Sequence, residues 1–518
     1  MKKITKRITA VFLGAAMLAG IAGCGTSKTS SSNNDNGRET ITWWVGLNAN
    51  TAQTVSNLGE TPFAKALEEK FNVNIEFIHP AQGQDAEKFN IMIAMGDLPD
   101  IIEYDWNSYS GGPAKALEDG VIQEINIDND APSLAAYVKE NPSVDKQIKT
   151  DDGKYFGYPF IRGDRSLQTS AGIIIRKDWL DDLGMSVPET IDEWTETLTA
   201  FKEKKGASAP LDFATWHYSY GAFVGAYNTA DGMYINDEGK VAYGPIEQEY
   251  KSFLEKMNEW YKAGLLNSDF VSLDNSIIQS DILNGYSGAT VGSVGGNMGK
   301  WLAAKPDDKF DLAAAPYPVL NKGDKPEFGQ LQNSVTGTYA VISRDCKNAE
   351  LCKQILDYGY SEEGQMLFNF GIEGESYVMK DGYPEYTEKI TNNPDGLSMS
   401  AALAQYALSH TEGPFIQDKR YMEQYASLPQ QQEAITIWSD TNMEKHLMPR
   451  ISLLPEQTKV MASKIENIDT YKSEMVSKFI MGLEPIENFD SYVTELKNRG
   501  IDEYVDMMQQ AYDRFKTR

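Results

Sequence analysis

The chain has 518 residues, 41% of them hydrophobic, which is enough apolar material for two or three folded lobes with cores of their own. It carries 75 acidic residues against 48 basic ones, for a formal net charge of −27. A surface this acidic repels nucleic acid and offers no basic patch to anionic lipids. With only four histidines and three cysteines, metal ligation and triad chemistry are disfavoured. The 27 tyrosines, 20 phenylalanines and nine tryptophans, by contrast, need a role.

The N-terminus has the pattern of a secretion signal. Four basic residues among the first seven precede an apolar run over residues 8–22, which is too short to span a membrane comfortably and ends in small residues. The sequence Ile21-Ala22-Gly23-Cys24 closes the run and resembles the lipobox of bacterial lipoproteins, whose cysteine is diacylated, typically with palmitate, and becomes the mature N-terminus. We therefore expect cleavage of the signal peptide, residues 1–23, and extracytoplasmic anchoring to the bacterial cell membrane by a lipid on Cys24. The alternative is an ordinary signal peptide followed by an incidental cysteine.

A polar linker leads from this cysteine to the folded part. Residues 24–38 are rich in Ser, Asn and Gly and almost free of apolar residues, which is typical of a flexible spacer. Expected strands at 41–45, 73–78 and 99–104 then alternate with expected helices at 63–71 and 85–95. This order predicts a parallel, doubly wound sheet. Ligands of such sheets bind beyond the carboxyl ends of the strands, so residues 46–48 and 104–108 are the segments of interest.

The remaining elements are mixed, with helices dominating toward the C-terminus. Strands are expected over residues 154–160, 173–176, 287–294 and 338–342, and a glycine-rich loop over 295–299. Helices are expected over residues 178–183, 191–204, 247–263, 349–358 and 362–370 and, after about residue 398, near 399–409, 430–446, 456–481, 488–498 and 501–516. Thr190 and Glu193 have the spacing of a capping box, and Asp381-Gly382 is the turn of a hairpin.

Beyond Cys24 there are two cysteines, Cys346 and Cys352, near the start of a predicted helix. Six residues apart on one helix they would lie on different faces, so we expect no disulfide unless Cys346 lies outside the helix. With one acidic residue nearby and no histidine, they make no zinc site.

Several short motifs occur in an order that resembles the extracellular carbohydrate-binding proteins of ABC importers. Trp43-Trp44, residues 96–102 (GDLPDII) and residues 157–160 (GYPF) are similar to the first lobe of that family. More specific are residues 243–246 (YGPI), 368–374 (FNFGIEG) and 482–485 (GLEP), which are similar to its large lipoprotein branch. The resemblance covers essentially the whole chain after the linker.

The resemblance implies an α/β, two-lobed periplasmic-binding-protein-like fold, with doubly wound sheets, a hinge and a mostly helical C-terminal region. Lobe 1 would comprise residues 39–168 plus 338–425, and lobe 2 residues 169–337 plus 426–518. The implied function is capture of an oligosaccharide between the lobes and delivery to the permease subunits of an ABC transporter. We expect a monomer without a cofactor.

A sugar ring has an apolar face and polar edges, so its site needs aromatic side chains together with carboxylates or amides. The positions that match the family's cleft segments and supply such side chains are Trp44, Asn48, Tyr104, Asp105, Trp106, Arg162, Asp164, Trp216, Tyr220, Asn297 and Trp301. Trp43 alternates with Trp44 along a strand, so one of the two should be core. Trp216 fits a core position as well as a ligand contact, and Trp438, on a helix with apolar neighbours, is expected in the core.

One departure from the family concerns metal. Some members carry a calcium loop after the helix that matches residues 191–204. Here residues 204–210 (KKGASAP) hold two lysines and no carboxylate, which cannot form a cage of hard oxygen ligands, so we expect no metal there. Residues 236–239 (NDEG) fit a turn better than a calcium loop.

Two other functions remain open at this point. A secreted glycoside-active enzyme would also be acidic and aromatic-rich, with Asp105 and Asp164 as its carboxylate pair, although no motif singles them out. A binding protein for a peptide or another small solute would keep the fold and change the ligand. Because a uronate would want convergent arginines and only Arg162 and Arg165 lie close together, a neutral oligosaccharide is favoured.

Overall fold

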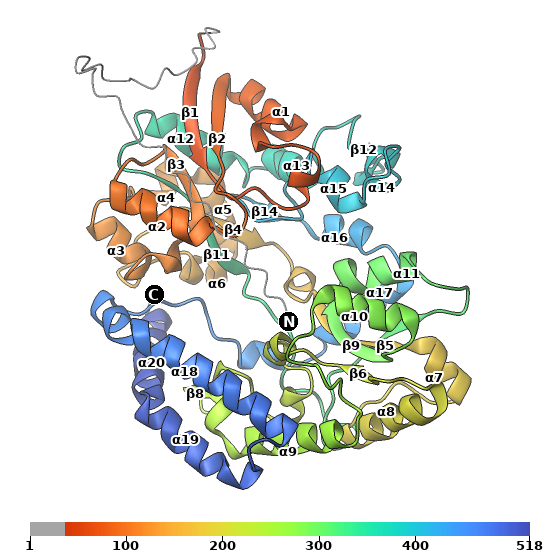
Figure 1. The fold of residues 1–518 in the computed structure, drawn as a ribbon. Coiled ribbons are helices and arrows are strands. Elements are labelled where there is room, and N and C mark those ends of the chain that lie inside the picture. The colour runs from red at the N-terminus through yellow and green to blue at the C-terminus, as the bar shows by residue number, and fades with distance from the viewer. Residues whose placement is uncertain (1–36) are drawn as a thin grey trace, which may run out of the picture. The chain divides into compact units, whose positions relative to one another are not determined.

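The structure is a computed structural model that describes residues 37–518, so the predicted signal peptide, Cys24 and most of the linker lie outside the described residues. Met1–Glu39 and Thr40–Arg518 are separate units, and the second contains nearly all of the described residues. This unit is built on two larger sheets, each with a hydrophobic core of its own (Figure 1). Between residues 37 and 518 no helix combines the length and the apolar character that crossing a membrane requires.

Lobe 1 is built on a six-stranded sheet with the order β14-β4-β11-β3-β1-β2. Its strands are β1 (Glu39–Trp44), β2 (Val73–Ile78), β3 (Ile101–Asp105), β4 (Tyr158–Arg162), β11 (Val335–Ile342) and β14 (Ile416–Gln417). The expected parallel pairing is confirmed for β1 and β3, with Trp43 opposite Ile101. β11 runs antiparallel to β3 and begins at its carboxyl end, with Thr338 opposite Asp105, because the chain re-enters this sheet at that edge.

Helices cover this sheet. They are α1 (Pro62–Phe71), α2 (Asp85–Met95), α3 (Gly112–Glu118), α4 (Ile127–Asp130), α5 (Pro132–Glu140), α6 (Pro142–Gln147), α12 (Ala349–Tyr358) and α13 (Glu362–Phe370). Four of them, α1, α2, α12 and α13, stand where the sequence predicts helices, whereas α3 to α6 were not predicted. α1 begins with Thr61, whose side chain accepts a hydrogen bond from the backbone N–H of Ala64, and Pro62 occupies its first position. Helices on the sheet explain why Trp43 and Trp44, which alternate along β1, are both buried, at 3% and 5% exposure.

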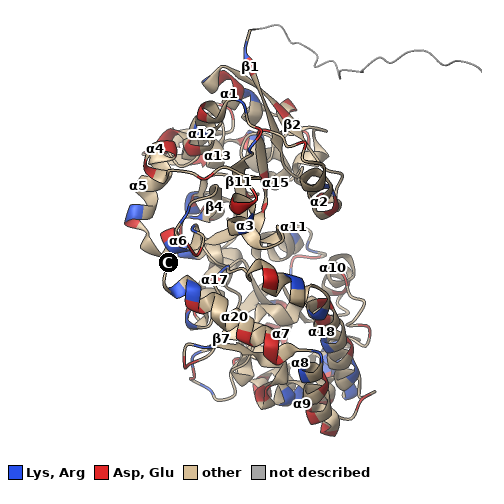
Figure 2. Ribbon diagram, turned by 90° about the vertical axis from the view of Figure 1, so that its left-hand side faces the viewer, with Lys and Arg blue, Asp and Glu red and all other residues tan. Residues whose placement is uncertain are grey.

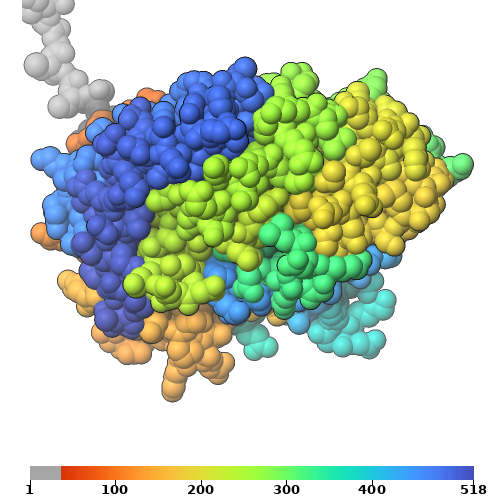
Figure 3. Space-filling model, turned by 90° about the horizontal axis from the view of Figure 1, so that it is seen from below, coloured from red at the N-terminus to blue at the C-terminus, as the bar shows by residue number. Residues whose placement is uncertain are grey.

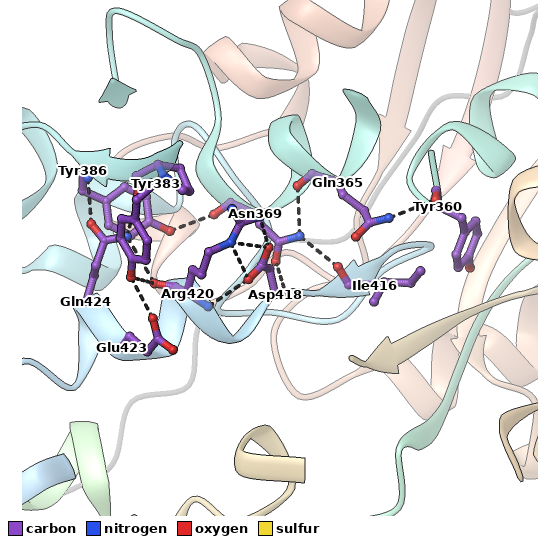
Figure 4. A network of polar contacts seen from close by, with 11 residues as sticks. Tyr360, Gln365, Asn369, Tyr383, Tyr386, Ile416, Asp418, Arg420, Glu423 and Gln424 are labelled. Carbon is purple, nitrogen blue, oxygen red and sulfur yellow. Dashed lines mark hydrogen bonds and ion pairs between the residues drawn. The ribbon is translucent and has the colours of Figure 1, made fainter. Parts of the chain in front are cut away.

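A small hairpin extends lobe 1 and has a core of its own. β12 (Tyr377–Lys380) and β13 (Tyr383–Tyr386) are joined by Asp381 and Gly382, both in the left-handed region at φ 52° and 81°, so the predicted hairpin is confirmed. Asn369 fixes this region from α13: its side chain donates to the carbonyl of Ile416 (2.8 Å) and accepts from the backbone N–H of Asp418 (2.8 Å) (Figure 4). The neighbouring helices are α14 (Glu388–Thr391), α15 (Met399–Leu403) and α16 (Lys419–Tyr425).

Lobe 2 is built on a four-stranded sheet with the order β10-β5-β9-β6. Its strands are β5 (Ala171–Arg176), β6 (Leu211–Asp212), β9 (Ala289–Ser293) and β10 (Leu312–Ala315), and a separate hairpin consists of β7 (Met233–Ile235) and β8 (Val241–Tyr243). Trp438, on α17 (Pro429–Ser439), is fully buried against Gly172 and donates to the carbonyl of Ile173 (3.3 Å), which confirms its predicted core position. Gly172 is required because a Cβ there would occupy the space of the indole ring.

Helices of four to 27 residues complete lobe 2. They are α7 (Lys177–Leu183), α8 (Ile191–Lys205), α9 (Gln248–Lys262), α10 (Asn275–Asn284), α11 (Lys300–Ala303), α18 (Pro455–Met481), α19 (Phe489–Asn498) and α20 (Ile501–Lys516). The predicted capping box of Thr190 and Glu193 is present at the start of α8. α18 packs along α9, so the C-terminal segment lies beside the middle of the chain (Figure 3). Both acidic and basic side chains lie on α18 and α20, and Lys464 of α18 forms an ion pair with Glu503 of α20 (Figure 2).

Two local predictions are wrong. β14 interrupts the C-terminal region predicted as helical, because a strand of two residues is too short to show an alternating pattern. The predicted loop 295–299 is a π-helical turn, η8 (Val294–Gly299). Its glycines allow close packing rather than a free loop: a Cβ at Gly295 would collide with Tyr425 and one at Gly299 with Gln431.

Candidate binding site

A cavity of about 370 Å³ opens in lobe 1 at the carboxyl ends of β1 and β3, where the rule for doubly wound sheets predicts a ligand site. Both segments singled out by that rule line it, through Gly46, Leu47 and Asn48 on one side and Tyr104 and Asp105 on the other. The cavity is further lined by β11 and by the segment 408–412. Its walls therefore come from parts of the chain that are far apart in sequence.

Local structure explains the shape of the first segment. β1 ends at Trp44, and the chain turns at Gly46, where a Cβ would stand 2.9 Å from Oδ1 of Asp85. Glycine at this position thus lets the start of α2 approach the loop. The side chain of Asn48 accepts a hydrogen bond from the backbone N–H of Asn50 (2.8 Å), which holds the loop at the cavity rim.

Aromatic rings form much of the wall. Tyr104 is partly exposed, stacks on Phe89 with 4.4 Å between ring centroids and meets Trp44 edge-on at 5.7 Å. Trp43 and Phe77, with centroids 5.6 Å apart, line another side of the cavity. A ring held by its neighbours in this way offers a rigid, flat apolar surface to a ligand.

Carboxylates supply the polar part. Oε2 of Glu103 accepts a hydrogen bond of 3.2 Å from Nε1 of Trp43. Burial raises the pKa of Glu103 to about 8, against the lowering effect of that hydrogen bond and with a smaller raising contribution from the charge of Glu412. Glu412 accepts a short hydrogen bond from the hydroxyl of Thr338. Asp105 accepts from the backbone N–H of Asn107 (3.0 Å) and forms an ion pair with Arg450.

Two other predicted residues of lobe 1 lie on a neighbouring segment and do not line the cavity. The guanidinium of Arg162 donates to the side-chain oxygen of Gln417 (3.2 Å), and burial lowers the pKa of Arg162. Asp164 begins the short helix η4 (Arg165–Gln168) by accepting from the backbone N–H of Ser166 (2.9 Å).

The predicted tryptophans of lobe 1 are packed inside it. Trp106 has no exposed surface, and Trp44 contacts Phe89 and Tyr104. In this conformation neither ring presents a face to a ligand, and burial of this degree favours a core role. The residue of β1 that does face the cavity is Trp43.

The predicted residues of lobe 2 do not converge on one place. Trp216 is 38% exposed and lines a second cavity, of about 620 Å³, beside α18. Trp301 is fully buried. Asn297 accepts from the backbone N–H and the hydroxyl of Ser293 (2.8 and 2.9 Å) and so stabilises the end of β9. Tyr220 is partly buried and stacks near His217 at 6.3 Å.

The lining residues that sequence reasoning did not list as ligand contacts include Trp43, Glu103 and Glu412. Glu103 carried a usable signal, because an acidic residue inside a buried strand needs a partner or a function. Glu412 belongs to no motif, and only the tertiary fold brings it to β3.

Residues 204–210, the segment where some family members carry a calcium loop, contain the C-terminal end of α8. Gly206 ends the helix in the left-handed conformation at φ 72°, and Lys205 forms an ion pair with Asp182 (2.7 Å). Within the part of the chain that the structure describes, no group of three His, Cys, Asp or Glu side chains is placed to hold a metal ion. Asn236 and Gly239 form the tight turn of the β7–β8 hairpin, as predicted.

Sequence comparison assigns the class of protein. Residues 48–366, more than half of the chain, match the family model for bacterial extracellular solute-binding proteins. The chain belongs to this family. Lipoprotein LipO of Bacillus subtilis is 24% identical and the match spans 99% of each chain. The fructooligosaccharide-binding protein FusA of Streptococcus pneumoniae is 23% identical over 100% of this chain and 99% of its own. The polygalacturonan/rhamnogalacturonan-binding protein YtcQ of B. subtilis is 25% identical over 86% and 88%.

Solved structures confirm the two-lobed fold. The alginate-binding protein AlgQ2 superposes with a TM-score of 0.72 and 24% identity, covering 92% of this chain and 98% of its own. A solute-binding protein of Bifidobacterium longum subsp. infantis reaches a TM-score of 0.75 with 19% identity, over 92% and 98%. The expected α/β fold with two lobes is thereby confirmed.

Proposed function

We propose that this protein captures an oligosaccharide between its lobes, with one sugar ring in the cavity of lobe 1. The observation that carries the proposal is the combination of rigid aromatic walls with carboxylate acceptors at the carboxyl ends of β1 and β3. A sugar ring needs this pairing, because its C–H face packs on an aromatic ring while its hydroxyls donate hydrogen bonds. Relatives whose names refer to fructooligosaccharides and to polygalacturonan support a saccharide ligand.

The lobes are residues 39–168 plus 338–425 and residues 169–337 plus 426–518. Two separate hydrophobic cores, one on each large sheet, support this division. Near the crossing the backbone N–H of Gln332 donates to the carbonyl of Gln168 (2.9 Å), so the two connecting segments run side by side. Segments of this kind serve as a hinge, and a ligand contacted by both lobes favours the closed state through its higher affinity for it.

The protein is an extracytoplasmic lipoprotein that acts as a monomer and delivers its ligand to the permease subunits of an ABC transporter. The lipobox-like sequence before Cys24 supports the anchor. Its family, named for extracellular solute-binding proteins, supports the compartment.

Its function is binding without catalysis. The two carboxylates proposed for an enzyme make other interactions. Asp105 forms an ion pair with Arg450. Asp164 caps the start of η4, and its carboxylate lies 3.8 Å from Nζ of Lys419. A glycosidase would instead hold two carboxylates on opposite sides of one sugar linkage.

The test is a set of melting curves with saccharides, combined with chromatography of the saccharides afterwards. A bound oligosaccharide at 100 times its Kd should add about 2.7 kcal/mol to the free energy of unfolding. We expect such a shift and the return of the saccharide intact. Cleavage products that disappear on Asp105→Asn would instead show an enzyme, and melting shifts with peptides alone would show a different ligand class.

A further inference from the structure

The cavity of lobe 1 has an uneven distribution of charge. Four of its lining residues are acidic, namely Asp85, Glu103, Asp105 and Glu412, and no lysine or arginine lines it. Of these four acids, Asp105 is ion-paired with an arginine, Arg450, from outside the lining.

Two of these acids, Glu103 and Glu412, accept hydrogen bonds from uncharged donors. Glu103 is 7% exposed and accepts from the indole of Trp43, and Glu412 accepts from the hydroxyl of Thr338. Arg162 is not among the lining residues and donates to Gln417, and burial lowers its pKa against the raising effect of the charge of Glu412. A negatively charged group entering the cavity would therefore meet acidic side chains and no lysine or arginine among the lining residues.

We propose that this cavity selects a sugar ring without negative charge and rejects a uronate, with Glu412 as the residue that determines this specificity. The inference rests on the proposed function. Hydroxyl groups of a neutral sugar donate to carboxylates, whereas a uronate carboxylate is an acceptor that faces other acceptors. Repulsion between like charges is stronger where side chains are partly buried, as Glu412 is, than between fully exposed groups.

The protonation of Glu103 leaves the rejection of a uronate to Glu412. Since burial raises the pKa of Glu103 to about 8, its carboxyl is largely protonated at neutral pH and provides an O–H donor as well as an acceptor. A neutral sugar hydroxyl can use both, so the pair Glu103 and Glu412 presents one donor and several acceptors.

The experiment uses probes that differ in charge. Trigalacturonate and its fully methyl-esterified form share one backbone, and kestose and raffinose serve as further neutral probes. Titration calorimetry is carried out with the full protein, with Glu412→Gln, and with Glu487→Gln, which removes a charge from an exposed residue outside the cavity. We expect neutral probes to bind the wild type at least tenfold more tightly than trigalacturonate. Glu412→Gln should narrow that ratio about tenfold, and Glu487→Gln should leave it unchanged.

Three results would overturn the proposal. Tighter binding of trigalacturonate than of its methyl ester by the wild type shows that the cavity does not reject uronates. An unchanged ratio in Glu412→Gln shows that this carboxylate does not determine specificity. If no saccharide of either charge binds, the proposed function itself has failed and the selectivity falls with it.

A separate observation concerns the two cysteines after β11. Cys346 lies in the turn before α12, three residues ahead of its first residue Ala349, so the objection to a disulfide between residues on different faces of one helix does not apply. Its Sγ lies 3.5 Å from Sγ of Cys352, and the thiol of Cys352 lowers the pKa of Cys346 through a hydrogen bond. A thiol whose pKa is lowered is more often the reactive thiolate.

We infer that Cys346 and Cys352 form a disulfide in the extracytoplasmic protein. The thiolate of Cys346 attacks a disulfide of a thiol–disulfide oxidoreductase, and Cys352 then displaces that partner. Both protein thiols lose a proton and together two electrons, and the oxidoreductase leaves as a dithiol. Extracellular compartments favour this outcome.

The thiols are counted in protein taken from the cell envelope without reductant. After denaturation and treatment with N-ethylmaleimide, we expect no adduct on the peptide that carries both cysteines, and two adducts once it has been reduced. Cys352→Ser is the control, because it should leave Cys346 open to alkylation without reduction. Two adducts on the unreduced wild type would overturn the inference.

Discussion

Nε1 of Trp43 donates a hydrogen bond of 3.2 Å to Oε2 of Glu103 at the edge of lobe 1. The two residues stand on neighbouring parallel strands, β1 and β3, and both line the cavity. This contact satisfies a buried carboxyl and fixes the orientation of an aromatic ring at the same time. The same hydrogen bond therefore contributes to the stability of the sheet and to the shape of the cavity.

The raised pKa of Glu103 predicts a pH dependence of stability. The folded chain holds this proton up to a pKa of about 8, whereas the ordinary value is 4.5, so the folded state binds more protons between these values. The contribution of Glu103 to stability is complete below pH 4.5 and is lost as the pH rises to about 8, with a slope of up to about 1.4 kcal/mol per pH unit.

Denaturant unfolding at several pH values measures this effect. Glu103→Gln keeps an acceptor for Trp43 and should remove the dependence. The difference between the free energies of unfolding of the two proteins separates the effect of Glu103 from that of His410. Burial lowers the pKa of His410 to about 4, so its contribution to stability changes with pH in the opposite direction below pH 6.5. A difference that is constant from pH 4 to 9 would contradict the role given to Glu103.

Trp106 and Trp216 are both candidate ligand contacts in the sequence, but the structure buries them to different degrees. Trp106 has no exposed surface, so Trp106→Ala should lower the free energy of unfolding by about 3–5 kcal/mol through loss of apolar contact and formation of a cavity. Trp216 is 38% exposed, and Trp216→Ala should cost about 1 kcal/mol or less. Urea titrations of both variants test this, and equal losses would show that the two rings are packed alike.

Residues near the end of β3 show which parts of the site the sequence could predict and which it could not. Asn48, Tyr104 and Asp105 were found because each follows a strand whose order along the chain already defines the sheet edge. Trp106 follows the same strand, but the chain turns inward there through the short helix η3 (Trp106–Ser108). No local pattern reports such a turn, so its ring could not be assigned to the core.

Other parts of the site depend on tertiary structure alone. Strand alternation predicted that one of Trp43 and Trp44 belongs to the core, and helices on the sheet bury both. Glu412 meets Thr338 only because β11 returns from the other lobe to the edge of β3. Strand register, and the direction in which β11 re-enters the sheet, are set by packing over the whole domain. The periodicity of a single sequence carries no information about such packing.

The anchor is tested by removing the acylated side chain. Because a diacylated cysteine holds a protein at a membrane and an unmodified chain does not, Cys24→Ala should move the protein from the membrane fraction to the medium. Immunoblots of the two fractions measure this. Retention of the variant at the wild-type level would show that another feature holds the protein.

Metal removal should have no effect on this protein. The segment 204–210 contains no carboxylate, and the nearby carboxylate of Asp182 forms an ion pair with Lys205. We therefore expect the same melting temperature with and without a calcium chelator. A drop that added calcium reverses would reveal an ion site and correct this expectation.

The central claim is that a saccharide binds in the cavity of lobe 1, and its affinity in two matched variants tests that claim most directly. Tyr104→Ala removes a partly exposed ring from this cavity, and Trp216→Ala removes a ring from the cavity beside α18. Titration calorimetry with the oligosaccharide that gives the largest melting shift should show a loss of tenfold or more for Tyr104→Ala, about 1–2 kcal/mol, and no more than a twofold change for Trp216→Ala. Unchanged affinity in Tyr104→Ala with a large loss in Trp216→Ala would place the ligand in lobe 2 and contradict the account.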